Sequence, residues 1–271
     1  MTKTFITDLD GTFLNDQHQF DRALFADVLA QIEAQAGHFI VASGRDYKMA
    51  AHVFAGFEER ISFAVDNGAT IKTADGQLNA VTAISPAGLL DLQSQIDQMG
   101  NYPADGAIAV TTDKIYSLTP VDDLIAEFRA IMTALYGEFH RVETLQDIAE
   151  PVIKASLFYG NELNDKFINN IRAVNGAVHA TTPGFGVVDI MAQGINKAVS
   201  VKKIMAHYGA DPAQSYAFGD GMNDLEMLQL IAHPHKMPVA DERLLDLGFA
   251  TAIAGHNESG VLKTIQQILA Q

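Results

Sequence analysis

Short apolar runs alternate with longer amphipathic segments in the first quarter of the chain. Runs of strand length, rich in Phe, Ile and Val, occupy residues 3–7, 38–43 and 61–67. Between the first two runs, apolar side chains recur at every fourth position and mark one face of a helix: Phe20, Leu24, Val28 and Ile32. A second helix is predicted over residues 46–54. This strand–helix alternation predicts a parallel sheet with helices on its faces.

The pattern changes after residue 68. Residues 69–82 are predicted to form two strands joined through Asp75-Gly76, a strong hairpin signal. From residue 85 to about residue 183 we predict a helix, a hairpin at 107–118, a helix, a strand, a helix at 162–174 and a last strand. This order indicates an α+β unit with antiparallel pairing.

The alternation of strands and helices resumes after this unit. Helices are predicted over residues 197–208 and 224–231 and up to about Leu269, with strands at 215–220, 237–240 and 250–254. We therefore predict an α/β fold, in which a Rossmann-like parallel sheet with helices on both faces is interrupted by an inserted α+β domain. The predicted core comprises residues 1–84 and 186–271, and the inserted domain comprises residues 85–185.

Composition narrows the classes of function. The chain has 18 basic and 33 acidic residues, a formal net charge of −15, which disfavours nucleic acid and anionic membranes as main partners. It contains no cysteine, so disulfides, zinc–thiolate sites and thiol nucleophiles are excluded. We find no secretory signal and no apolar stretch near the ~18 residues of a membrane span, and expect a cytoplasmic protein. Nothing in the sequence indicates the oligomeric state.

Polar residues gather where strands of the predicted core end. Asp8 and Asp10 follow the first strand, Ser43-Gly44-Arg45 follows the second, and residues 219–224 (GDGMND) follow a later one. Lys197 begins the helix before that later strand. Ligands of open parallel sheets bind beyond the carboxyl ends of the strands, so we expect these residues to share one crevice.

The acidic residues of this set predict a metal site. Asp8 and Asp10 lie two positions apart, and Asp220 and Asp224 would bring further negative charge to the same crevice. Neighbouring carboxylates repel one another unless a cation or a shared proton relieves them. Mg²⁺ suits such a site, since it prefers oxygen ligands and also binds substrate phosphate. A carboxylate, a serine hydroxyl and a lysine are together suited to phosphoryl transfer.

The motifs resemble those of the haloacid dehalogenase superfamily. DLDGT (8–12 with its preceding strand), VASGR (41–45), GINKAVSVK (194–202) and GDGMND (219–224) match the four motifs of the superfamily in their order. The long insert between the second and third motifs, together with DNGA (66–69), is similar to the Cof-type sugar-phosphatase-like hydrolases. The loop after the fourth motif departs from the family pattern.

The resemblance implies a role for each matching residue. Asp8 would be the nucleophile and a Mg²⁺ ligand, and Asp10 the general acid and then base, with its backbone carbonyl on the metal. Asp220 and Asp224 would complete the metal site. Ser43, Gly44, Lys197 and Asn223 would hold the phosphoryl group, and the insert would be a cap that selects a small phosphorylated metabolite. The implied activity is hydrolysis of phosphate monoesters through an aspartyl-phosphate.

Other interpretations stay open at this stage. Arg45 and Asp46 are equally well read as a surface ion pair or as a contact to the leaving group. His233 and His235 flank Pro234 in what we expect to be an exposed loop rather than a metal site. At the level of function, the alternatives are a phosphomutase or phosphotransferase on the same core and a non-catalytic phosphate-binding protein. A signalling receiver domain is disfavoured, because its acceptor Asp lies on a later strand and the domain needs about half this length.

Overall fold

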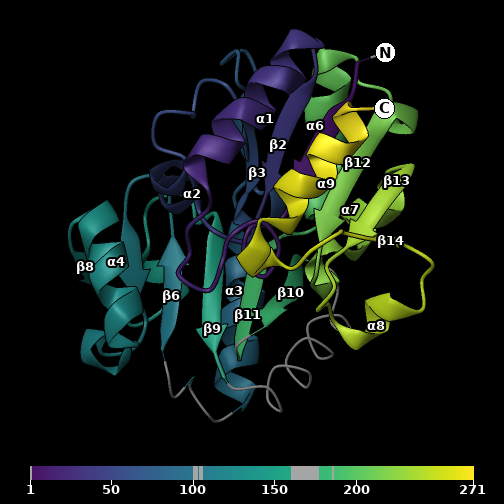
Figure 1. Cartoon of the computed structure of the whole chain (residues 1–271). Coiled ribbons are helices and arrows are strands. Elements are labelled where there is room, and N and C mark those ends of the chain that lie inside the picture. The colour runs from purple at the N-terminus through teal and green to yellow at the C-terminus, as the bar shows by residue number, and fades with distance from the viewer. Residues whose placement is uncertain (1, 100–102, 104–105, 160–176, 185) are drawn as a thin grey trace. The chain divides into compact units, whose positions relative to one another are not determined.

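A computed structural model describes residues 2–99, 103, 106–159, 177–184 and 186–271 of the chain (Figure 1). These residues divide into two compact units, one formed by residues 1–80 with 196–271 and the other by residues 81–195. We call the first the core unit and the second the inserted unit. Because β11 pairs within the sheet of the inserted unit, that unit extends to Ile195, whereas the sequence suggested a boundary at residue 185.

The core unit alternates strands and helices as predicted. Its elements are β1 (Thr4–Thr7), α1 (Arg22–Ala34), β2 (His38–Ala42), α2 (Tyr47–Val53), β3 (Ser62–Val65), β4 (Thr70–Lys72), β5 (Asn79–Val81), α6 (Lys197–Tyr208), β12 (Ser215–Gly219), α7 (Leu225–Leu230), β13 (His233–Lys236), α8 (Glu242–Leu245), β14 (Ala250–Thr251) and α9 (Gly260–Leu269).

One eight-stranded sheet organises the core unit, in the order β14-β13-β12-β1-β2-β3-β4-β5. The strands from β14 to β3 pair in parallel, and β4 pairs antiparallel to β3. Strand β1 lies between β12 and β2, with Thr7 opposite Phe218 and Val41. The carboxyl ends of these three central strands therefore meet at one edge of the sheet. The predicted α/β class is confirmed.

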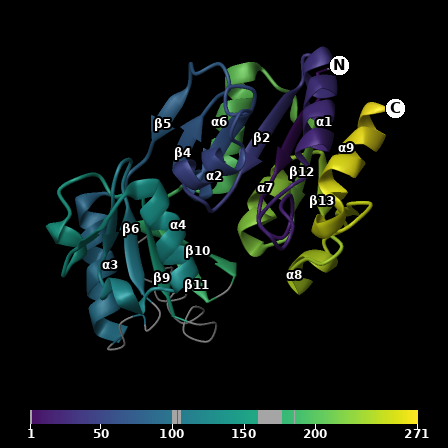
Figure 2. The same ribbon diagram turned by 60° about the vertical axis from the view of Figure 1, so that its left-hand side comes forward.

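Helices cover both faces of this sheet. Helices α1 and α9 lie side by side on one face (Figures 1 and 2), where their apolar residues pack with those of the strands, Phe5 and Phe39 among them. Helices α6 and α7 cover the other face, where Val201 and Leu228 pack against Ile6 and Ile40. Burial of two apolar layers fixes the sheet, and its strand ends, in a rigid framework.

The inserted unit has an α+β structure. Its described elements are α3 (Pro86–Met99), β6 (Ala107–Val110), β7 (Ile115–Ser117), α4 (Ala126–Tyr136), β8 (Phe139–Arg141), β9 (Lys154–Phe158), β10 (Val178–Gly184) and β11 (Val187–Ala192). The strands form a six-stranded sheet in the order β10-β11-β9-β6-β7-β8, antiparallel except for β7 with β8. Helix α3 packs its apolar face on this sheet through Leu92 and Ile96. The helix predicted at 162–174 lies outside the described residues.

One predicted strand was wrong. The strand expected at 237–240 instead covers His233–Lys236, so the histidines that flank Pro234 belong to β13 and not to a loop. A proline is tolerated here because β14 pairs only with His235 and Lys236. The missing N–H of Pro234 therefore leaves no gap in a ladder on that side.

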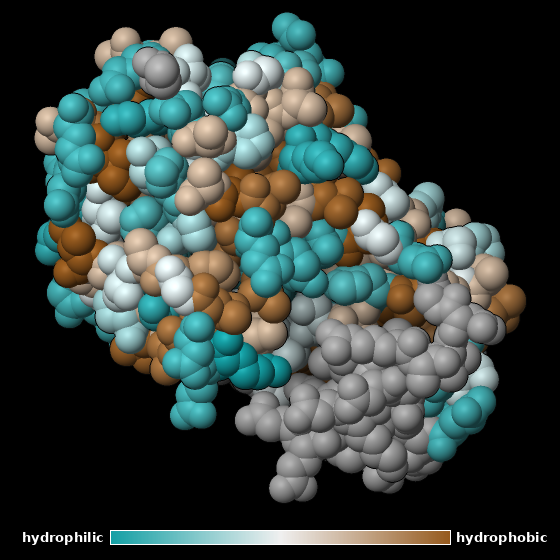
Figure 3. Space-filling view, turned by 90° about the vertical axis from the view of Figure 1, so that its right-hand side faces the viewer, coloured by the Kyte–Doolittle hydropathy of each residue, from teal (hydrophilic) through white to brown (hydrophobic). Residues whose placement is uncertain are grey.

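The surface of the core unit carries scattered apolar side chains. Figure 3 shows one face of the molecule, on which hydrophobic and hydrophilic residues are interspersed. Large apolar residues exposed in the α8–β14 region are Val239, Leu245, Leu247 and Ile253. Single exposed apolar residues are normal on a protein surface. Within the described ranges, no helix has the length and apolar content needed to cross a lipid bilayer.

Candidate active site

The end of β1 places the first two acidic residues. The backbone N–H of Asp8 donates to the carbonyl of Phe218 at 3.0 Å, which continues the parallel ladder with β12. The chain then turns at Gly11, whose φ of +76° is left-handed. A side chain at this position would also collide with the carboxylate of Asp220. Glycine is thus required here both by the turn and by the approach of Asp220.

Lys197 is buried between two carboxylates. Its Nζ donates to Asp8 Oδ1 at 2.7 Å and to Asp224 Oδ1 at 2.6 Å, and only 1% of its side chain is exposed. Burial alone would lower the pKa of Lys197, but the charges of Asp224 and Asp8 outweigh burial and raise it. The lysine is therefore charged at neutral pH and fixed in place.

Three carboxylates converge beside this lysine. Oxygen atoms of Asp8, Asp220 and Asp224 lie within 4.8 Å of one another. Thr12 Oγ1 donates to Asp220 Oδ1 at 2.6 Å, which fixes the orientation of that carboxylate. With one lysine against three carboxylates, the cluster is left with an excess of two negative charges when all are ionised.

The excess negative charge contributes to raised pKa values of two carboxyl groups in the cluster. Burial, followed by the charge of Asp224, raises the pKa of Asp8 well above 3.8 even though Lys197 opposes this change. Burial and the charge of Asp224 likewise raise the pKa of Asp220 from 3.8 to about 6. Groups of this kind are relieved by a proton or by a cation.

The cluster fits a divalent cation that prefers oxygen ligands. Asp8 Oδ2 and Asp220 Oδ2 receive no hydrogen bond from the described residues, whereas both oxygens of Asp224 are engaged. Asp224 Oδ1 accepts from Lys197, and its Oδ2 accepts from the N–H groups of Asp220 and Gly221, each at 3.0 Å. Asp8 and Asp220 thus offer the open oxygen atoms of the cluster.

Asp10 is held apart from the cluster by Arg45. Arg45 Nε donates to Asp10 Oδ2 at 2.8 Å and its Nη2 to Oδ1 at 2.5 Å, a bidentate pair. His18 Nδ1 lies 3.3 Å from Asp10 Oδ1. Burial raises the pKa of Asp10, but the hydrogen bond and charge of Arg45 more than offset this and lower it below 3.8.

Of the two interpretations left open for Arg45 and Asp46, the surface ion pair is wrong. Asp46 is 2% exposed and caps helix α2, where its Oδ1 accepts from the N–H of Met49 at 3.0 Å. Since Asp46 takes the capping position, Arg45 is directed to Asp10 instead.

The remaining sequence-predicted residues surround the same strand ends. Ser43 is 1% exposed and its Oγ accepts from the N–H of Arg45 at 3.1 Å, with Gly44 between them in the loop after β2. Asn223 lies in the short helical turn Met222–Asp224, and its Nδ2 donates to Asn67 Oδ1 at 3.3 Å. Sequence reasoning did not assign site roles to Asn67, Thr12 or His18. The DNGA and DLDGT motifs contain the first two, whereas His18 carried no signal.

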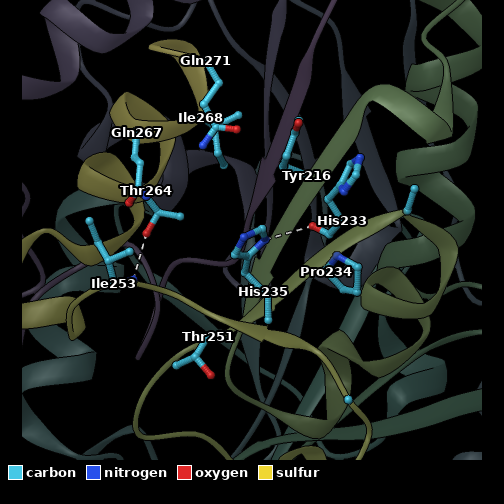
Figure 4. A pocket seen from close by; sticks show the side chains of 13 residues that line it. Tyr216, His233, Pro234, His235, Thr251, Ile253, Thr264, Gln267, Ile268 and Gln271 are labelled. Carbon is cyan, nitrogen blue, oxygen red and sulfur yellow. Dashed lines mark hydrogen bonds between the residues drawn. The ribbon is translucent and has the colours of Figure 1, made fainter.

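The histidines of β13 lie elsewhere in the core unit. His233, Pro234 and His235 line a cavity of about 540 Å³ together with residues of α9 such as Gln267 (Figure 4). His235 Nδ1 lies 3.0 Å from the carbonyl of His233, and the ring of His233 stacks on Tyr216. Among the described residues, no third metal-ligating side chain accompanies the two histidines.

Comparison with known proteins identifies the family. A family model described as haloacid dehalogenase-like hydrolase matches residues 5–265. The chain belongs to the haloacid dehalogenase-like hydrolase family. The resemblance inferred from the four motifs is thus confirmed, and with it the predicted class of enzyme, a hydrolase.

Several relatives of this haloacid dehalogenase-like hydrolase are phosphatases. It is 25% identical over 272 residues to the 5-amino-6-(5-phospho-D-ribitylamino)uracil phosphatase YbjI of Escherichia coli, covering 98% of this chain and 96% of that protein. The corresponding phosphatase YitU of Bacillus subtilis is 27% identical over 234 residues, covering 82% and 81%. A crystal structure of a Streptococcus mutans protein is similar with a TM-score of 0.89 and 25% identity, covering 100% of both chains.

Proposed function

We propose that the chain is a Mg²⁺-dependent phosphatase that hydrolyses small phosphate monoesters through an aspartyl-phosphate on Asp8. The observation that carries the proposal is the buried Asp8 carboxylate, 2.7 Å from Lys197 and within 4.8 Å of Asp220 and Asp224. A carboxylate with one open oxygen, fixed beside a lysine and a cation-binding cluster, is equipped to attack phosphorus.

Two steps follow from this arrangement. A carboxylate oxygen of Asp8 forms a bond to phosphorus while the bond to the leaving oxygen breaks, and Asp10 gives that oxygen its proton. Asp10 then accepts a proton from water, whose oxygen attacks the aspartyl-phosphate, so that phosphate leaves and Asp8 is regenerated. The proton lost by Asp10 in the first step is thus recovered in the second.

Arg45 suits Asp10 to the second step. Its two hydrogen bonds favour the ionised carboxylate, which is the form that accepts a proton from water. The first step needs a protonated Asp10, so the guanidinium must turn from Asp10 toward the substrate when a phosphate ester binds. Arg45 lies on the loop after β2, beside Ser43, so we propose that its guanidinium can bind either Asp10 or the phosphate of the substrate.

The other residues hold the phosphoryl oxygens. Lys197 supplies a fixed positive charge, while Ser43, Asn223 and the backbone at Gly44 supply hydrogen-bond donors. Asp8, Asp220 and the backbone carbonyl of Asp10 would hold Mg²⁺, and Asp224 would support it by fixing Lys197 and the loop at Asp220. When bound, Mg²⁺ neutralises charge on the phosphoryl oxygens.

The substrate class rests on the relatives. The names of two of them specify a phosphate ester on a ribityl chain. We therefore propose phosphorylated sugars and sugar alcohols, or metabolites that carry them, as substrates of this chain. The acidic composition agrees with a small ligand held by a few local donors rather than a polyanion.

The test is release of inorganic phosphate from an aryl phosphate and from hexose, pentose and pentitol phosphates, with Mg²⁺ and with EDTA. Asp8→Asn removes the nucleophile at nearly constant shape, and Asp27→Asn, an exposed position on α1, is the matched control. We expect Mg²⁺-dependent release by the wild type and the control, and none by Asp8→Asn. Release that survives in Asp8→Asn would refute the aspartyl-phosphate.

The panel also separates the alternatives. A phosphomutase would return the phosphoryl group to a sugar phosphate, so an isomeric ester would accumulate instead of inorganic phosphate. A binding protein would bind the esters without any conversion. The presence of both Asp8 and Asp10 favours catalysis over binding alone.

A further inference from the structure

The turn between β3 and β4 has an unusual backbone. Asp66, Asn67 and Gly68 follow one another with φ angles of +54°, +51° and +99°. Glycine adopts such angles readily, whereas in other residues they lower the stability of the fold. Asp66 and Asn67 are nonetheless 2% and 1% exposed, so this costly turn is buried in the core unit. We call residues 66–68 the β3–β4 turn.

The strained backbone is directed at the loop that carries Ser43. The N–H of Asn67 donates to the carbonyl of Ser43 at 2.9 Å, and the N–H of Asp66 donates to the carbonyl of Arg45 at 2.8 Å. An extended backbone at these positions would direct the two N–H groups elsewhere. The β3–β4 turn therefore holds the loop after β2 in place through two backbone hydrogen bonds.

The side chain of Asn67 reaches a second loop. Its Oδ1 accepts the hydrogen bond from Asn223 Nδ2, 3.3 Å away, in the turn after β12. Because an amide nitrogen carries two hydrogens, this contact leaves the second N–H of Asn223 for a ligand. It also sets the orientation of the Asn223 amide, which could otherwise rotate freely at its partly exposed position.

The third residue of the turn contacts the start of helix α6. The hydroxyl of Ser200 donates to the carbonyl of Gly68, and a side chain at Gly68 would collide with the carbonyl of Asn196. Asn196 caps α6, since its Oδ1 accepts from the N–H of Val199 at 2.9 Å. Lys197 is the first residue of that helix.

We propose that Asn67 is a positioning residue of the phosphate site, which orients Asn223 through its side chain and the Ser43 loop through its backbone. This inference rests on the proposed function, in which Ser43 and Asn223 donate to the phosphoryl group. The β3–β4 turn contacts three separate segments that carry phosphate donors: the Ser43 loop, the Asn223 turn and the start of α6 at Lys197. A turn that served only to join two strands would need none of these contacts.

The test separates the side chain from the backbone. Asn67→Gly keeps the left-handed backbone without strain but removes the acceptor for Asn223. We expect KM for an aryl phosphate, and the dissociation constant for inorganic phosphate in Mg²⁺, to rise about two- to tenfold, the effect of losing one hydrogen bond. The thermal midpoint reports the sum of relieved backbone strain and the lost buried side chain, whereas kcat should change less than KM because the contact acts on binding.

A double-mutant cycle with Asn223→Ala identifies the route of the effect. If Asn67 acts through Asn223, adding Asn67→Gly to Asn223→Ala leaves KM and phosphate affinity where Asn223→Ala alone puts them. Ala36→Gly is the control, because Ala36 also has a left-handed φ of +54° and is exposed at the end of α1. It should raise the thermal midpoint slightly without changing KM.

Two results would overturn the proposal. One is an Asn67→Gly variant with unchanged KM and phosphate affinity. The other is an effect of equal size in the wild-type and Asn223→Ala backgrounds. Should the wild type bind inorganic phosphate but release none from esters, the proposed catalysis fails while the phosphate affinities still decide the role of Asn67.

Discussion

Replacement of Lys197 by methionine tests the charge balance of the site most directly. Methionine matches the length and helix propensity of lysine, so the start of α6 should form as before. The substitution removes the ammonium that lies 2.7 Å from Asp8 and 2.6 Å from Asp224. Both carboxylates stay buried, with 9% and 0% of their side chains exposed.

The expected loss of stability is large. Removing one partner of a buried ion pair leaves a buried charge without compensation, which costs about 3–5 kcal/mol. Asp224 retains the two backbone N–H groups on Oδ2, whereas Asp8 loses Lys197, the one donor to its carboxylate among the described residues. We therefore expect Lys197→Met to lower the free energy of unfolding by about 3–5 kcal/mol at pH 8 without metal.

The same reasoning fixes the pH dependence. The pKa of Lys197 is raised in the folded protein, so its stabilisation is fully present below pH 10.5, the ordinary value. The pKa of Asp8 is already raised, and loss of Lys197 raises it further. As the pH falls through this raised pKa, Asp8 takes up a proton in the folded variant and its charge disappears. The destabilisation should thus be smaller at pH 5 than at pH 8.

The assay is urea unfolding in EDTA at the two pH values. Lys202→Met, an exposed lysine on the same helix, is the matched control and should stay within about 0.5 kcal/mol of the wild type. A Lys197→Met variant as stable as this control at pH 8 would refute the charge balance described here. So would a destabilisation that grows from pH 8 to pH 5.

Two further predictions concern the metal cluster. In the proposed site Mg²⁺ binding requires an ionised Asp220, whose pKa is raised to about 6. The apparent Mg²⁺ affinity, measured by calorimetry, should therefore be about tenfold weaker at pH 5 than above pH 7. Equal Mg²⁺ affinity at both pH values would contradict this. Gly11→Ala should abolish Mg²⁺-dependent phosphate release, because its side chain would displace the Asp220 carboxylate, while Gly56→Ala, at a φ of +87° with open space around it, should affect only stability. Equal activity of the two variants would show that the close approach of Asp220 to Gly11 is unimportant.

Local sequence signals predicted the core better than its edges. The apolar runs predicted β1, β2 and β3 because these strands are buried on both faces and need apolar side chains at successive positions. Strand β13 was missed because Pro234 argues against a strand unless one side of it is unpaired, and only the sheet order supplies that information. Whether a residue of a strand has a neighbour on both sides is a property of tertiary structure, which no local pattern encodes.

The same division applies to the site. The sequence predicted that Asp8, Lys197, Asp220 and Asp224 lie close together, because each of them follows or begins an element with a clear apolar pattern. The partner of Arg45 could not be predicted, since Asp10 and Asp46 are both acidic and only the cap of α2 decides between them. Asn67 was missed for a similar reason: the role proposed for it rests on backbone angles and on a contact with a residue 156 positions away.

The arrangement of charges predicts that a metal and a proton compete for this site. Arg45 neutralises Asp10, and Lys197 neutralises one of the three clustered carboxylates, so two negative charges remain. Without a cation, the protein relieves them by protonation, which is the origin of the raised pKa values of Asp8 and Asp220. A divalent cation would carry the two positive charges required and would leave Asp8 ionised. In the proposed mechanism the ionised form attacks phosphorus, so the charge imbalance of the metal-free site would also make the proposed nucleophile depend on the metal.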